Sequence, residues 1–108
     1  MTIAHWPSDN DLGRALSEER YVLKLYVTGT TPRSASAVVN VRRVCDEHLS
    51  GRYDLEVIDV LREPERAVKE QIVAAPTLVK HSPLPVRRLI GDMSKTDRLI
   101  AGLGIKDP

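Results

Sequence analysis

Cys45 and His48 are the residues of this chain whose types and spacing come closest to catalytic or metal-binding chemistry. Residues three apart meet on one face of a helix, so a thiol and an imidazole would lie together there. A zinc site needs about four ligands, or three and a water, and the other histidines, His5 and His81, stand far away in the sequence. A cysteine nucleophile would also need an orienting third group, and none is evident. We therefore expect Cys45 to be a small core residue and expect no metal or other cofactor.

The loop after the first apolar run lacks the groups that an enzyme would place there. A disulfide-exchange enzyme carries its thiol at the start of a helix, where the helix dipole lowers the thiol pKa. Here residues 28–32 read TGTTP, without a cysteine and without the length and lysine of a phosphate-binding loop. Asp54 and Glu56 alternate along a predicted strand, which is more typical of a solvated face than of an acid–base pair. We expect a protein that is not an enzyme.

The composition places these residues in one small soluble domain. The chain has 108 residues, of which 42% are hydrophobic and 29% charged. It has no phenylalanine, one tryptophan and three tyrosines, so valine, leucine and isoleucine must build the core. No apolar run reaches the roughly 18–20 residues that span a bilayer, and the start lacks a secretory pattern. A single cysteine cannot form an internal disulfide, so we expect a cytoplasmic protein without membrane contact.

Short runs of β-branched and aromatic residues predict the strands of this domain. They lie at Tyr21–Val27, Tyr53–Leu61, Thr77–His81 and Val86–Ile90. Thr31 and Pro32 are suited to cap and open a helix between the first two strands, which makes those strands parallel. Pro64 opens a second helix, and Ser94 is the predicted cap of the last one.

The resulting order is β-α-β-α-β-β-α, which is a thioredoxin-like α/β arrangement. Residues 1–20 show no sustained apolar periodicity and contain four acids, so we assign them to a flexible N-terminal extension. Residues 21–108 form the predicted domain.

A basic segment and a proline cluster are the other notable features. No acid occurs between Gln71 and Gly91, a stretch that contains Lys80, His81, Arg87 and Arg88. These cations are either solvated strand ends or a docking site for an acidic protein surface. The stretch has no aromatic residue for base stacking, so we expect no nucleic-acid partner.

Three prolines, Pro76, Pro83 and Pro85, fall in the same stretch. They either end elements and stiffen turns, or make a slow conformational step, because X-Pro bonds isomerise slowly.

Three segments, YVLKLYVTGTTPRS, YDLEVIDVLREPERA and IVAAPTLVKHSPLPVRRLIGDMS, closely resemble the KaiB family of bacterial circadian clock proteins. The resemblance runs from about Tyr21 to Leu103, and APTL, PLPVRR and IGD carry it together. It implies a regulator that binds the hexameric ATPase KaiC. It also implies a metamorphic domain, whose C-terminal half switches between a self-associating ground-state fold and a monomeric thioredoxin-like fold. Only the thioredoxin-like fold binds KaiC in the family, and we expect that fold here.

The resemblance also implies roles for individual residues. Basic positions of the family used for partner or subunit contact match Lys80, Arg87 and Arg88, and a KaiA-docking position on the edge strand matches Tyr53. The half that rearranges contains Pro76, Pro83, Pro85 and Gly102, with Pro76 at a cis-proline position and Gly102 near the hinge.

The chain also departs from the family pattern. Glu56 reverses a basic position near Tyr53, which argues against KaiA as a partner, and Gly104 stands where cyanobacterial members have aspartate. Both departures indicate a divergent homologue. The alternatives are a thioredoxin-like interaction domain that acts with a histidine kinase, and a thiol-redox protein.

Overall fold

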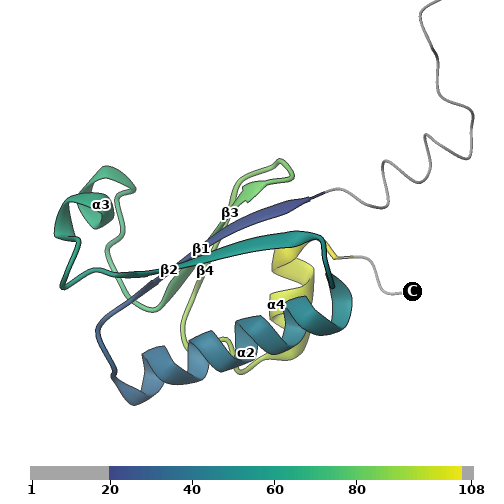
Figure 1. The fold of residues 1–108 in the computed structure, drawn as a ribbon, viewed down its shortest axis with the longest axis horizontal. Coiled ribbons are helices and arrows are strands. Elements are labelled where there is room, and N and C mark those ends of the chain that lie inside the picture. The colour runs from purple at the N-terminus through teal and green to yellow at the C-terminus, as the bar shows by residue number, and fades with distance from the viewer. Residues whose placement is uncertain (1–19, 106–108) are drawn as a thin grey trace, which may run out of the picture.

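A four-stranded mixed sheet organises residues 20–105, which are the residues that the computed structural model describes. The elements are β1 (Tyr21–Val27), α2 (Pro32–His48), β2 (Tyr53–Asp59), α3 (Pro64–Lys69), β3 (Thr77–Ser82), β4 (Arg87–Ile90) and α4 (Thr96–Leu103). The strand order is β2-β1-β3-β4, with β1 and β2 parallel and the other pairs antiparallel. Figure 1 shows α2 and α4 against one face of this sheet and α3 beyond the other. The predicted element order and the parallel pair are confirmed, whereas the assigned extension lies outside the described residues except for Arg20.

α2 begins with the cap that the sequence predicts. The Thr31 hydroxyl accepts a hydrogen bond from the Ser34 amide at 3.3 Å. Pro32 occupies the first turn, where a backbone N–H would have no acceptor within the helix, so its absence costs nothing. At the other end, the Leu49 amide donates to the Cys45 carbonyl at 2.7 Å. Local chemistry therefore sets the helix that crosses from β1 to β2.

The main core lies between the sheet and the two helices α2 and α4. Its buried members from the strands, the helices and the segments beside them are Tyr21, Leu23, Leu25, Val27, Ala37, Val41, Val44, Cys45, Leu49, Leu78, Met93, Leu99 and Leu103. Burying one such aliphatic side chain contributes about 1.5–3 kcal/mol. Aliphatic packing thus supplies what phenylalanines supply in other domains.

The opposite face of the sheet is only partly covered. Tyr26, Ile58 and Val79 form a small second cluster there, against which Val60 and Ile72 pack. α3 is short because the chain turns at Gln71, which has φ 56°, and the Ile72 amide donates back to the Ala67 carbonyl at 2.8 Å. The second helix therefore ends well before Pro76, the residue that limits it in the sequence.

Two predicted boundaries are wrong for identifiable reasons. β2 ends at Asp59 rather than Leu61, because the Asp59 carboxylate accepts from the amides of Gly29 and Leu61 at 3.1 and 2.9 Å. Ser94 does not cap α4, because its hydroxyl bonds the Asp92 carboxylate, to which its amide also donates at 3.0 Å. The helix begins two residues later, with Lys95 at the cap position and no side-chain cap.

α4 packs so closely on β4 that a side chain at Gly102 would have to displace the partly exposed Leu89 side chain. A Cβ built there would lie 2.5 Å from Cδ2 and 2.8 Å from Cδ1 of Leu89. The contact joins two elements of the C-terminal half and depends on this arrangement of the chain.

Gly102→Ala is expected to lower the free energy of unfolding. Overpacking of this kind costs about 1–3 kcal/mol, which exceeds the roughly 1 kcal/mol that alanine gains over glycine in a helix. Urea denaturation measures the difference. In a Leu89→Ala background the obstructing methyl groups are gone, so the same substitution becomes neutral or stabilising. Equal destabilisation in both backgrounds would contradict the contact as the cause.

Candidate functional site

The loop from β1 to α2 is closed by hydrogen bonds of hydroxyl groups. The Ser34 hydroxyl accepts from the Thr28 amide at 3.0 Å, and Ser34 is almost fully buried. The Thr31 hydroxyl is occupied by the Ser34 amide. This helix start is the place where a disulfide-exchange enzyme would hold its thiol, and here it holds a structural serine.

Cys45 lies in the middle of α2 and is fully buried in the main core. Burial, with a smaller contribution from the nearby Asp46 carboxylate, raises the pKa of its thiol to about 12. A thiol with this pKa stays protonated at neutral pH and is a poor nucleophile. Within residues 20–105, no group of three or more metal-ligating side chains comes together.

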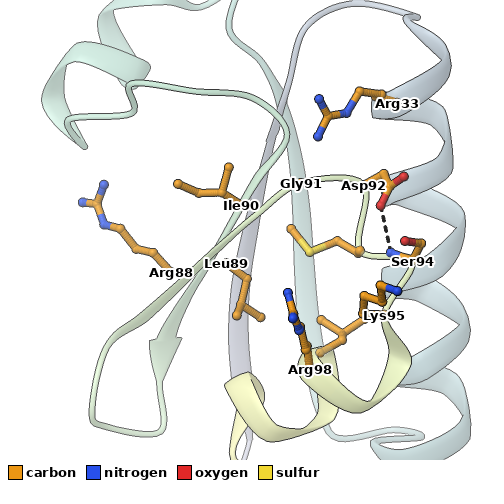
Figure 2. A pocket seen from close by; sticks show the side chains of 11 residues that line it. Arg33, Arg88, Leu89, Ile90, Gly91, Asp92, Ser94, Lys95 and Arg98 are labelled. Atoms are coloured by element: carbon orange, nitrogen blue, oxygen red, sulfur yellow. Dashed lines mark hydrogen bonds between the residues drawn. The ribbon is translucent and has the colours of Figure 1, made fainter.

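A cleft of about 510 Å³ opens where β4 ends and the chain turns into α4 (Figure 2). Its apolar lining comes from Leu89, Ile90, Met93 and Leu99. Its charged lining comes from Arg33, Arg88, Lys95 and Arg98, with the single acid Asp92. Arg33 reaches over from α2, and its Nη2 would lie 3.8 Å from a Cβ built at Gly91.

Asp92 does not neutralise this cleft. Hydrogen bonds from the Ser94 hydroxyl and amide hold the pKa of its carboxyl below the ordinary value, and the positive charge of Arg33 lowers it further. The carboxylate is therefore ionised and engaged by its own loop. Arg33, Lys95 and Arg98 are exposed and make no hydrogen bond or ion pair with another side chain among residues 20–105. An excess of positive charge faces solvent here.

Contacts from distant segments hold the cleft loop in place. The Gly91 amide donates to the Pro76 carbonyl at 3.0 Å, and the Asn40 side-chain amide of α2 donates to the Asp92 carbonyl at 2.9 Å. Arg43 of α2 donates to the Thr96 hydroxyl at 3.2 Å. The Ala75–Pro76 bond is cis, as the resemblance implies for this position.

The basic residues singled out in the sequence do not form one surface. Lys80 is buried, and its ammonium donates to the Leu103 carbonyl at the end of α4 at 3.4 Å. Arg87 is exposed opposite Lys80 in the sheet register. Arg88 lies on the other face, where its guanidinium donates to the carbonyls of Glu70 and Gln71 at 2.6 and 3.2 Å. Two of the three cations thus hold elements together, and Arg87 alone of them is free of such a contact.

The other predicted site residues occupy separate places. Tyr53 lies on the edge strand β2, and its hydroxyl donates to the Asp46 carboxylate of α2 at 2.6 Å. Pro83 and Pro85 lie in the turn between β3 and β4, where both X-Pro bonds are cis. Gly102 lies in α4 against Leu89.

Both acids of the β2 face are paired, in agreement with their interpretation as a solvated face. Asp54 pairs with Arg20 and Glu56 with Arg66, each at 2.7 Å.

The sequence prediction missed Arg33, Lys95 and Arg98, which line the cleft from two different helices. A signal was present, because each cation stands at the cap or in the first turn of a predicted helix. Positive charge is unfavourable there, since the helix dipole is positive at that end. A cation without a local stabilising role is a reason to look for a ligand.

Residues 24–105 match the model of the KaiB domain. The chain belongs to the KaiB family. Circadian clock protein KaiB3 of a Synechocystis species is 49% identical over 86 residues, covering 80% of this chain and 84% of that protein. Circadian clock oscillator protein KaiB of Synechococcus elongatus is 46% identical over 85 residues, covering 79% and 83%. The relatives are therefore circadian clock proteins matched over most of their length.

Solved structures confirm the thioredoxin-like fold. The N-terminal domain of Synechococcus elongatus SasA has a TM-score of 0.66 at 20% identity, covering 100% of this chain and 97% of that one. Mitochondrial thioredoxin 3 of Saccharomyces cerevisiae has a TM-score of 0.65 at 12% identity, covering 88% and 87%. At these identities the likeness concerns the fold alone.

The Cys45 thiol is expected to be unreactive in the folded protein. Burial and a pKa of about 12 leave almost no thiolate at neutral pH. A disulfide reagent that releases a coloured thiolate should therefore react slowly with the native protein and rapidly after unfolding in guanidinium. Cys45→Ala provides the blank. Rapid reaction of one thiol per native protein molecule would contradict this expectation and support the thiol-redox alternative.

The Tyr53 phenol is expected to have a higher pKa in the folded protein than in the unfolded chain. Its hydrogen bond to Asp46, together with a smaller effect of burial, raises the pKa from 10.0 to about 12. Because the folded pKa is the higher one, the stabilisation is complete below pH 10 and is lost as the pH rises toward 12. Ultraviolet titration should show Asp46→Asn lowering this pKa, and Tyr53→Phe identifies the band. An unchanged titration in Asp46→Asn would contradict the assignment.

Proposed function

We propose that this KaiB-family protein is a non-enzymatic regulator that binds a KaiC-like hexameric ATPase and modulates its phosphorylation and ATPase cycle. The observation that supports this most is the arrangement of the C-terminal half. β3 and β4 complete the four-stranded sheet, and α4 packs against it as in a thioredoxin-like domain. In the resemblance, this arrangement is the one that binds KaiC. The proposed role is timing or stress-related signalling.

The chemistry of the described residues supports regulation by binding. The helix start that would hold a catalytic thiol holds Ser34, and the thiol of Cys45 is buried. No helix among residues 20–105 is long and apolar enough to cross a membrane. In this proposal the protein acts in the cytoplasm and binds neither nucleic acid nor a cofactor.

Individual residues take different roles in this proposal. Arg87 is exposed on β4 and contacts the partner directly. Lys80 and Arg88 act through the fold, because their contacts with Leu103 and Glu70 hold α4 and the end of α3 in place. KaiA is not a proposed partner, since Glu56 places a carboxylate, paired with Arg66, on the β2 face.

Fold switching remains part of the proposal. The segments that would rearrange include Pro76, Pro83, Pro85 and Gly102. The polar contacts from α2 to the loop before α4 and to the first residue of α4 come from Asn40 and Arg43, both at the surface or partly buried. Such contacts contribute about 1 kcal/mol each, so a second, self-associating arrangement would mainly have to replace the burial of Leu78, Leu99 and Leu103.

Mixing this protein with the KaiC-like ATPase of the same organism is expected to give co-elution in size-exclusion chromatography in the presence of ATP. Arg87→Glu should weaken the complex about 5-fold or more, because one exposed ion pair becomes a like-charge contact. Lys69→Glu, an exposed charge reversal on α3, is the matched control and should bind normally. No co-elution in any nucleotide or phosphorylation state would exclude the proposed function. Binding to a histidine kinase instead would favour the alternative partner.

A further inference from the structure

The cleft at the end of β4 holds positive charge that the fold does not use. Several other arginines of the described residues are held by the fold: Arg20 by Asp54, Arg66 by Glu56, and Arg88 by the carbonyls of Glu70 and Gln71. Arg33, Lys95 and Arg98 line the cleft and have no such partner within residues 20–105. Figure 2 shows Arg33 and Arg98 entering the cleft from opposite sides, one from α2 and the other from α4.

Stability does not explain these three cations. Arg33 lies in the first turn of α2, Lys95 at the cap of α4 and Arg98 in its first turn. A cation near the positive end of a helix is unfavourable by a few tenths of a kcal/mol or more. Neutral residues at these positions would avoid the dipole cost. Of the three, Arg33 gains an attraction to the Asp92 carboxylate in return, and the remaining positive charge is available to a ligand.

The form of the cleft limits what this ligand is. Its volume of about 510 Å³ lies within the range of sites for small molecules and peptide side chains, and far exceeds a single inorganic anion. Its apolar lining includes the buried Met93 and Leu99 and the largely exposed Ile90. It has no aromatic residue on which a nucleotide base could stack. The ligand that fits is both anionic and apolar.

We propose that the cleft binds an acidic peptide segment of the partner ATPase, with carboxylates against Arg33, Lys95 and Arg98. An apolar side chain of the same segment covers Ile90 and Leu89. The identity of the protein that carries the segment rests on the proposed function, whereas the charge and shape of the cleft do not. The partner contact thus extends from Arg87 around the end of the sheet to the cleft.

Charge neutralisation in the full chain tests the proposal. The cleft variant Arg33→Gln/Lys95→Gln/Arg98→Gln is compared with the control variant Arg42→Gln/Arg62→Gln/Lys69→Gln, whose three cations are exposed outside the cleft. Both variants lose the same net charge. The cleft variant is expected to bind the KaiC-like ATPase about 10-fold more weakly, with a shallower salt dependence, and to unfold no more easily than wild type. Equal binding by both variants would overturn the proposal while leaving the proposed function in place.

A synthetic probe separates the cleft from the partner. The acidic pentapeptide Asp-Glu-Ile-Glu-Asp is titrated into the protein and followed by NMR, beside its amide counterpart Asn-Gln-Ile-Gln-Asn. The acidic peptide is expected to shift the amides of residues 89–99 in wild type and in the control variant, but not in the cleft variant. If the ATPase does not bind and this pattern still appears, the proposed function fails and the cleft stands. No shift in wild type would overturn the cleft.

The chain's own N-terminal segment is the competing occupant, since residues 1–19 contain four acids and one arginine. Asp9→Asn/Asp11→Asn in the full chain tests it. Shifts of the cleft amides in this variant without any peptide would assign the cleft to that segment and overturn the partner assignment. An unchanged spectrum would support the partner.

Discussion

The burial of one face of β1 is the constraint on which the rest of this structure depends. Tyr21, Leu23, Leu25 and Val27 alternate along this strand, and all four side chains are buried against α2 and α4. β1 also bonds to β2 on one side and to β3 on the other, so the two halves of the sheet meet at the β1–β3 pair. The chain leaves β1 for the start of α2, and β3 in turn positions the end of β4. The cleft exists because those two ends meet.

Lys80 shows how the same constraint decides what a charge can do. It lies on the buried face of β3, beside Leu23, where an isolated cation would be costly. Its ammonium is stabilised there by a hydrogen bond to the Leu103 carbonyl and by the negative end of the α4 dipole. Arg88, the residue after Arg87, is turned to the other face, where its guanidinium donates to the carbonyls of Glu70 and Gln71 just after α3. A segment that is basic in the sequence is thus divided between packing and surface.

The fold was predictable because its signals are local, whereas the cleft was not because its members are distant. Thr31, Pro32 and the alternating strands act over a few residues, and each behaves as predicted. The predicted cap of the last helix failed where a neighbouring side chain intervened, because the Asp92 carboxylate accepts a hydrogen bond from the Ser94 amide. Arg33 and Arg98 are far apart in the sequence, and only the packing of α4 beside α2 brings them to one cleft.

The end of α4 bears on which arrangement of the C-terminal half is favoured. Gly104 closes the helix with φ 71°, a left-handed conformation that a side chain makes unfavourable. An aspartate, which the resemblance places here in cyanobacterial members, would meet that backbone cost. A Cβ at this position would also lie 3.5 Å from the Lys80 ammonium, so a carboxylate there would compete with the Leu103 carbonyl for it. Glycine avoids the backbone cost, and Lys80 bonds the helix end. Glycine therefore fits the left-handed end of α4 in the thioredoxin-like arrangement, the one whose β4 and α4 line the cleft.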